Sequence, residues 1–494
     1  MASSSAPYPF GECAPIRAKT RIDFGLSHFH YYPGAGMGNH QRKYSLEPRD
    51  VPRVETSNRR IVTMLPVPES LPILEALERF EPSSMQGQPP LVIDRAQGWS
   101  VYDKWGNKWL DWSSGVLISN IGNGHPEVVS AIKEMADRPL LSTYVFAHEK
   151  RAELVKLLNS VAPSKGYKVF LLTTGSEATE NCIKLARTWG FERHGPERRV
   201  LVSFENAFHG RTMGAQLAGG NASQKGWLGR LDESFVQVPF PDGYTNRDLR
   251  FDLFVETLER KGVKPSQVCG VMTESFQGVG PDFFPDGYAR NLESWCRENE
   301  ALLIVDEVQA GFGRTGKWFA FEHYGITPDL IACGKAISGS LPLSAVLGRA
   351  DVMELYPPGS MTSTHSGSPL PVAAAVASVK ALQAGGYLEN AQELDPVLRN
   401  GLERISARHP DSVGSVRSRG LVGGVRLVKR GTHQPDPLAA LAVNTRCFHK
   451  GLLMFAPVGA FGECIKIAPA LDISHDALVE GISVLGEAMD EALA

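Results

Sequence analysis

One lysine of this chain stands where an apolar strand is expected to end. Residues 328–339 read Pro-Asp-Leu-Ile-Ala-Cys-Gly-Lys-Ala-Ile-Ser-Gly, so a short apolar run leads to Lys335 and then to turn-forming residues. Ligands of α/β sheets bind outside the carboxyl ends of strands. A lysine that is desolvated there has a lowered pKa and a nucleophilic amine. Taken alone, the segment also fits a surface lysine at the end of a strand.

Asp306 ends a second apolar run, Leu302–Val305, and is followed by Glu307. A carboxylate at the end of a buried strand costs several kcal/mol unless a partner offsets it. A protonated pyridine nitrogen is such a partner, because the carboxylate keeps the ring protonated and able to withdraw electrons. A helix-capping or salt-bridged aspartate is the alternative. Two neighbouring acids also suggest a metal site, but no His or Cys stands near them at ligand spacing, so no metal is expected.

A phosphate site is suggested where another strand leads into a helix. Residues 171–178 read Leu-Leu-Thr-Thr-Gly-Ser-Glu-Ala. Backbone N–H groups at a helix start, together with the Ser176 hydroxyl, are suited to hold a phosphate, and Gly175 lets the backbone approach it closely. A serine followed by an acid is also an ordinary helix-capping arrangement.

Residues 204–212 place an aromatic ring beside a cation. Phe208, followed by His209 and Gly210, fits a ring that stacks on a flat cofactor, and Arg211 fits a carboxylate that it binds through two hydrogen bonds. The alternatives are core packing for Phe208 and a structural ion pair between Arg211 and Glu274.

The elements that must position these residues alternate along the chain. From about residue 127 to 350, segments with helical periodicity separate apolar runs of strand length, which predicts a mainly parallel sheet covered by helices on both faces. The chain ends are expected to form a smaller α+β domain. We therefore predict an arm or irregular extension over 1–66, with a mostly disordered tail as the alternative, small-domain parts over 67–125 and 371–494, and a large domain over 126–370. The predicted strands are Lys168–Thr173, Arg199–Phe204, Val268–Thr273, Leu302–Asp306, Leu330–Cys333 and Ser344–Gly348.

Composition excludes several classes of function. The 494 residues carry a net charge of only -3, which gives no field that favours nucleic acid or an anionic membrane. No apolar run is long enough to span a bilayer. The seven cysteines are scattered singly, which argues against a disulfide framework and fits a reducing compartment. Since the first residues contain no apolar core of a secretory signal, we expect a cytoplasmic protein.

Five motifs together resemble the class III (omega-amino acid) aminotransferase family of fold-type I enzymes, which use pyridoxal 5'-phosphate. They are T-G-S-E-A, F-H-G-R-T, E-x-x-Q-G, V-D-E-V-Q-x-G-x-G-R-T-G and the lysine segment, and the likeness runs from about Gly98 to Leu485. Members of the family include 4-aminobutyrate, ornithine and acetylornithine aminotransferases. The resemblance implies a large α/β domain with a seven-stranded, mainly parallel sheet.

The resemblance also implies a role for each matching residue. Lys335 forms a Schiff base with the cofactor and then moves the proton between substrate and cofactor, while Asp306 holds the pyridine nitrogen. The other implied cofactor contacts are Val308 and Phe208 on the two ring faces, Gln309 near the phenolic oxygen, Gly175 and Ser176 at the phosphate, His209 and Glu274 beside them, and Thr364 reaching the phosphate of a neighbouring subunit. A site completed by the other chain implies a homodimer or a dimer of dimers.

Substrate contacts are implied for Arg211, Lys466 and Val116, although plain packing fits Val116 equally well. Two positions depart from members that use a second arginine and a movable glutamate: Val279 replaces the glutamate and Lys466 the arginine. Lysine cannot make the planar two-pronged contact, so Lys466 either holds a carboxylate more loosely or does not contact substrate. The departures argue against a plain 4-aminobutyrate or ornithine enzyme.

The activity implied is transamination: a donor converts the cofactor to its pyridoxamine form, and a 2-oxo acid such as pyruvate or 2-oxoglutarate accepts the amine. The same scaffold supports racemases or epimerases, a dialkylglycine decarboxylase and phospho-lyases, which remain alternatives. A catalytically silent protein that binds the cofactor is a third reading, opposed by the intact Lys335 and Asp306.

Overall fold

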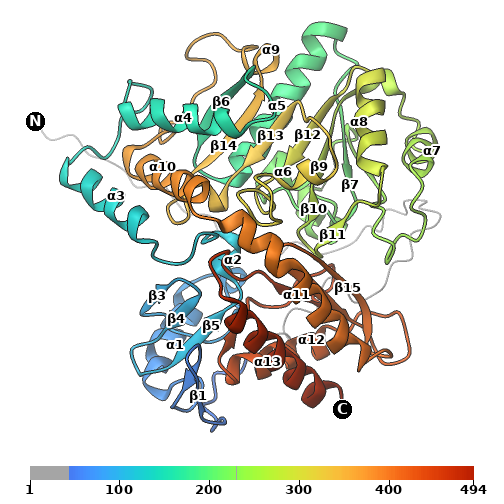
Figure 1. The fold of residues 1–494 in the computed structure, drawn as a ribbon. Helices are drawn as coiled ribbons and strands as arrows, with labels where there is room; N and C mark the ends of the chain where they lie inside the picture. The colour runs from blue at the N-terminus through green and yellow to red at the C-terminus, as the bar shows by residue number, and fades with distance from the viewer. Residues whose placement is uncertain (1–43, 230) are drawn as a thin grey trace, which may run out of the picture. The chain divides into compact units, whose positions relative to one another are not determined.

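The computed structural model describes residues 44–229 and 231–494, and its largest sheet has seven strands (Figure 1). All neighbouring strands are parallel except β14, which runs antiparallel to β13 and β6. The predicted mainly parallel sheet is therefore confirmed. In spatial order the strands are β6 (Tyr167–Leu172), β14 (Ser344–Arg349), β13 (Leu330–Cys333), β12 (Leu302–Asp306), β9 (Val268–Glu274), β7 (Val200–Phe204) and β8 (Phe235–Val238).

Alternate residues of each strand pack against helices on opposite faces. Leu302 and Ile304 of β12 join one core with residues of α5, whereas Leu303 and Val305 join the other. Since side chains alternate along a strand and both faces are covered, the strands are apolar throughout. One face packs against α5 (Gly175–His194), α6 (Met213–Ala218) and α9 (Ala350–Met353), and the other against α4 (Glu149–Val161), α7 (Asp252–Arg260), α8 (Tyr288–Glu298) and α10 (Pro369–Ala384).

Segments before α3 and after α10 build a second region, as the sequence pattern predicts (Figure 1). Leu452 of β17 pairs with Leu110 of β5, so a strand from the C-terminal part extends a sheet from the N-terminal part. That sheet contains β1 (Val54–Glu55), β2 (Arg60–Ile61), β5 (Lys108–Asp111), β4 (Ser100–Tyr102), β3 (Arg95–Gln97) and β17 (Leu452–Leu453). A three-stranded sheet follows the order β15 (Val413–Arg419), β16 (Val422–Leu427) and β18 (Cys464–Ile467).

The remaining strands and α-helices complete the described part. A two-stranded hairpin precedes α8, and the remaining helices lie before α4 or after α10. They are β10 (Phe276–Gln277), β11 (Asp282–Phe283), α1 (Leu71–Phe80), α2 (Ser114–Leu117), α3 (Pro126–Asp137), α11 (Tyr387–Ala407), α12 (Pro437–His449) and α13 (His475–Leu493).

The sequence predicts an irregular extension through residue 66, but β1 and β2 lie within it. Arg60 of β2 pairs with Lys108 of β5, so this stretch is part of the N-terminal sheet. Strands of two residues leave no alternating pattern in the sequence, which explains the error. The rest of the predicted extension, residues 1–43, lies outside the described residues, and the other domain boundaries stay predictions.

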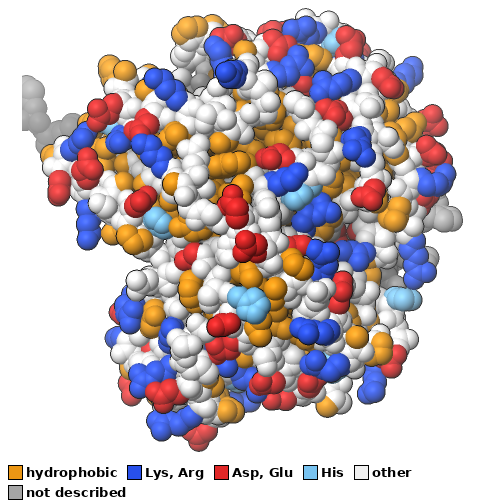
Figure 2. Space-filling model, in the orientation of Figure 1, with side chains coloured by type: hydrophobic (Ala, Val, Ile, Leu, Met, Phe, Trp, Pro, Cys, Tyr) orange, Lys and Arg blue, Asp and Glu red, His pale blue; other side chains and the backbone are white. Residues whose placement is uncertain are grey.

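Charges of both signs are interspersed on the face shown in Figure 2. This distribution accords with the small net charge of the sequence. Among the described residues, no helix has the length and apolar character needed to cross a bilayer.

Candidate active site

Loops that follow the parallel strands meet at the carboxyl edge of the large sheet. Asp306 at the end of β12 lies in register with Glu274 at the end of β9. Lys335 follows β13, the neighbour of β12 on its other side. Because the carboxyl ends of parallel strands share one edge, the sheet brings these three predicted site residues together.

Asp306 is held by two hydrogen bonds at this edge. One carboxylate oxygen lies 2.8 Å from Nδ1 of His209, and the other accepts from the backbone N–H of Val308 at 3.0 Å. Burial by itself lowers the pKa of His209, but the hydrogen bond and charge of Asp306 outweigh it and raise the pKa overall. The two hydrogen bonds together fix the orientation of the acid.

Lys335 presents a free amine beside these acids. It makes no hydrogen bond or ion pair with any described residue. Burial lowers its pKa, an effect partly opposed by the charges of Asp306 and Glu274. Its backbone is left-handed, with φ of 45°, which is strained for a residue with a side chain and is characteristic of functional sites. A lowered pKa and an amine without a partner suit a nucleophile.

The start of α5 is open to an anion. Thr174, the residue before the helix, accepts a hydrogen bond from the N–H of Glu177, whose carboxylate accepts from the N–H of Thr174. The alternative that Ser176 caps the helix is therefore wrong. The Ser176 hydroxyl and the N–H groups of Gly175 and Ser176 have no partner among the described residues, so they are available to a phosphate.

Val308 connects this helix start to the lysine loop. A Cβ added at Gly175 would lie 2.9 Å from a methyl group of Val308, and one added at Gly334 would lie 3.2 Å from the same methyl. Two segments predicted to contact one cofactor therefore meet at the residue predicted to lie under its ring.

Glu274 binds backbone N–H groups near Phe208. Its carboxylate accepts from the N–H of Phe208 at 3.0 Å and from the N–H of Gly278 at 2.8 Å. Burial raises its pKa to about 7. Arg211 is exposed, with its guanidinium 5.5 Å from the centre of the Phe208 ring. The alternative of an ion pair between Arg211 and Glu274 is wrong, because Glu274 already has these backbone partners and Arg211 lies over the ring.

The side chain of Lys466 is buried and hydrogen-bonded. Its side chain is only 2% exposed, and its ammonium donates to the carbonyl oxygen of Gly278 at 2.8 Å and to Oε1 of Gln309 at 2.7 Å. Burial lowers its pKa to about 7. Of the two readings offered by the sequence, these contacts favour the one in which Lys466 does not bind substrate.

Two predicted residues are not placed among this group. Val116 is 44% exposed in α2, where its φ of 64° is left-handed. Thr364 is exposed in the loop before α10. Their roles stay predictions.

Sequence reasoning missed the tasks of Thr174 and Glu307. The spacing Thr174-x-x-Glu177 is the signature of a capping box and identifies the cap in advance. Glu307 is fully buried and accepts a hydrogen bond from the hydroxyl of Ser275. It also accepts from the backbone N–H groups of Ala320 and Phe321, and both of these distances are 3.0 Å. Glu307 therefore holds a loop in place. Nothing in the sequence distinguishes such a structural glutamate from one that binds a metal or a cofactor. No cluster of three or more metal-ligating side chains occurs among the described residues.

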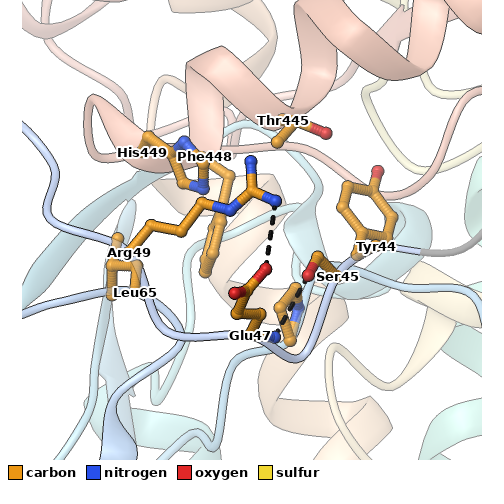
Figure 3. Close-up of a pocket in the computed structure, with 9 residues that line it drawn as sticks. Tyr44, Ser45, Glu47, Arg49, Leu65, Thr445, Phe448 and His449 are labelled. Carbon is orange, nitrogen blue, oxygen red and sulfur yellow. Dashed lines mark hydrogen bonds and ion pairs between the residues drawn. The ribbon is translucent and has the colours of Figure 1, made fainter.

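A separate pocket lies between the N-terminal segment and α12 (Figure 3). Arg49 and Glu47 form an ion pair of 3.3 Å there, and Tyr44, Leu65 and His449 also line it. It contains none of the predicted site residues, so it is not the candidate active site.

Comparisons with known proteins point in one direction. The sequence matches the family described as aminotransferase class-III over residues 83–489. The 4-aminobutyrate aminotransferase of Mycobacterium leprae is 33% identical over 448 residues, which are 88% of this chain and 98% of that protein. The acetylornithine aminotransferase of Caldanaerobacter subterraneus is 31% identical over 404 residues, 81% of this chain and 95% of that protein.

Solved structures agree with the sequence relatives. The (S)-enantioselective omega-transaminase of Thermomicrobium roseum superposes with a TM-score of 0.78 at 27% identity, covering 86% of this chain and 99% of that chain. The ornithine aminotransferase of Toxoplasma gondii gives a TM-score of 0.76, also at 27% identity, over 86% of this chain and 96% of that chain.

Proposed function

Because the chain belongs to the class III aminotransferase family, we propose that the residues gathered around Lys335 form its active site and that its donor is an omega-amino compound. The protein is an aminotransferase that depends on pyridoxal 5'-phosphate and has the fold of the fold-type I enzymes. It takes an amino group from a donor and passes it to a 2-oxo acid.

The described residues fit this cofactor at three points. The free amine of Lys335 suits its aldehyde, the fixed carboxylate of Asp306 suits its pyridine nitrogen, and the unpartnered donors of Gly175 and Ser176 suit its phosphate. When bound, the cofactor supplies an aldehyde that condenses with amines and a ring that withdraws electrons from the substrate carbon.

Each residue then has a task of its own. Asp306 would keep the ring nitrogen of the bound cofactor protonated, and His209 holds Asp306 in place at 2.8 Å. Val308 and Phe208 would contact the ring. Lys335, whose pKa is lowered by burial, removes and returns the proton at the substrate carbon that bears the amine.

Substrate recognition is proposed for Arg211. Its exposed guanidinium is held over Phe208, so a substrate carboxylate can reach it without displacing an ion pair. The names of the relatives, 4-aminobutyrate and acetylornithine aminotransferase among them, support an amine at a chain end. Val279 and the tethered Lys466 favour a donor other than 4-aminobutyrate or ornithine.

A homodimer that shares its active sites is also part of the proposal. Thr364 is exposed in a loop that touches a second exposed segment, since Tyr144 Oη lies 3.1 Å from Oγ1 of Thr362. Near Tyr144, Leu141 is 63% and Phe146 is 76% exposed. An apolar surface of this kind beside Thr364 suits contact with a second copy. Light scattering of the purified protein tests this, and a monomer would contradict it.

A cytoplasmic location is proposed from the thiols. The six cysteines in the described part of the chain are all free and buried. Free thiols suit a reducing compartment.

One observation carries the proposal: an unpaired lysine at the carboxyl edge of the sheet, beside the fixed carboxylate that ends the adjacent strand. Half-reaction spectroscopy tests it with a panel of 4-aminobutyrate, 5-aminovalerate, acetylornithine and primary amines. Transamination converts the cofactor spectrum to that of pyridoxamine phosphate and releases a carbonyl product. Racemisation without a 2-oxo acid, or release of carbon dioxide, would overturn it.

A further inference from the structure

Lys466 is a buried cation that the proposed roles leave without a task. It lies on β18, in the C-terminal part of the chain, yet both of its hydrogen-bond acceptors belong to loops at the edge of the large sheet. One acceptor is the carbonyl of Gly278 after β9, and the other is Gln309 after β12. Lys466 therefore joins two active-site loops from outside the sheet.

The contact fixes which way the amide of Gln309 points. The ammonium of lysine can only donate, so the amide oxygen Oε1 of Gln309, and not Nε2, faces the protonated Lys466. The amide N–H groups then face away from Lys466, and they have no acceptor among the described residues. Lys466 is the only hydrogen-bond partner of the Gln309 side chain among the described residues, and Nε2 packs against Gly278 without a hydrogen bond.

The same contact closes a chain of hydrogen bonds across the site. The N–H of Phe208 donates to Glu274, which also accepts from the N–H of Gly278. The carbonyl of Gly278 accepts from Lys466, which in turn donates to Gln309. The residue proposed for one face of the ring is thus linked to the residue proposed for its phenolic oxygen.

We propose that Lys466 is a positioning residue: it turns Gln309 so that the amide N–H groups donate to the phenolic oxygen of bound pyridoxal phosphate. This inference rests on the proposed function. Burial lowers the pKa of Lys466 to about 7, and the protonated form, which can only donate, is the one that fixes the orientation of Gln309.

Lys466→Met tests the inference, because it keeps an unbranched side chain and removes the donors. Cofactor affinity is measured by titrating cofactor-free protein with pyridoxal phosphate, and the absorbance of the bound cofactor is followed against pH. We expect about tenfold weaker binding, equivalent to about 1.4 kcal/mol, and a changed pH midpoint of the absorbance. A purely structural role would not move that midpoint.

Lys225→Met is the matched control. Lys225 is also buried, and its ammonium donates to the carbonyl of Leu217 at 2.8 Å and to Oε1 of Gln237 at 3.2 Å. The charge of Lys225 lowers the pKa of His209 slightly, so Lys225 lies near the site. The variant therefore removes a buried charge near the site and leaves the contacts of Gln309 unchanged. Binding within threefold of wild type, with an unchanged midpoint, is expected.

Gln309→Glu keeps the inference testable if Lys466→Met does not fold. A glutamate still accepts from Lys466 but has no N–H to donate, so the cofactor-free protein should melt no lower than wild type while cofactor binding falls tenfold or more. Wild-type affinity in this variant, or in folded Lys466→Met, would overturn the inference. Failure of the wild-type protein to bind pyridoxal phosphate would instead overturn the proposed function.

Discussion

Replacing Lys466 with methionine is expected to flatten the pH dependence of folding of the cofactor-free protein. The folded-state pKa of Lys466 is about 7, against 10.5 for a solvated lysine. Between these values the unfolded chain holds a proton that the folded protein has released, so the free energy of unfolding rises with pH. Below pH 7 the folded protein bears the whole free-energy cost of burying the charged ammonium. This cost falls as the pH rises from 7 to 10.5, because the folded protein buries the neutral amine instead.

The size of the effect follows from one proton. Each pH unit in this window contributes about 1.4 kcal/mol, so between pH 8 and pH 10 Lys466 adds roughly 3 kcal/mol to the stability of the wild-type protein. Methionine has no proton to release. The variant therefore gains about 3 kcal/mol less than wild type over this interval, whatever its absolute stability.

Equilibrium unfolding in urea, followed by tryptophan fluorescence at pH 8, 9 and 10, measures this difference. Lys133→Met is the control, because Lys133 is exposed on α3 and should leave the slope unchanged. If wild type and Lys466→Met gain the same free energy between pH 8 and pH 10, the buried contacts assigned to Lys466 are incorrect.

Three further substitutions have defined outcomes. Asp306→Asn should slow the half-reaction by about 100- to 1,000-fold in stopped-flow absorbance, since it removes the charge at the ring nitrogen; an unchanged rate would contradict that role. Ser176→Ala should weaken binding of pyridoxal phosphate, but not of pyridoxal, by about tenfold or more, and an equal loss for both ligands would exclude a phosphate contact. Arg426→Met strands the buried carboxylate of Asp282, to which Arg426 is paired, and should destabilise the protein by about 3–5 kcal/mol in urea; a loss below about 1 kcal/mol would show that the pair is unimportant.

Sequence alone located most of the large sheet and its edge. The strands Leu302–Asp306 and Leu330–Cys333 have the predicted bounds, because strands buried on both faces are short apolar runs that end where polar residues begin. Since the chemistry lies just after these ends, the same pattern located Asp306 and Lys335.

Long-range partners could not be predicted in this way. Lys466 bonds to Gln309, 157 residues earlier in the chain, and neither residue carries a local signal of that contact. The strands β1 and β2 were missed because two residues give no alternation to recognise, and β8 was missed because Gln237 interrupts its short apolar run. The cap formed by Thr174 is predictable, because its spacing to Glu177 is the signature of a capping box.

Reductive trapping tests the central claim most directly. The protein is loaded with pyridoxal phosphate, reduced with borohydride and digested, and the modified peptide is identified by mass spectrometry. We predict a phosphopyridoxyl group on Lys335, and no adduct at that position in Lys335→Ala. A cofactor trapped on another lysine, or a loaded protein that gives no adduct, would contradict the assignment of Lys335.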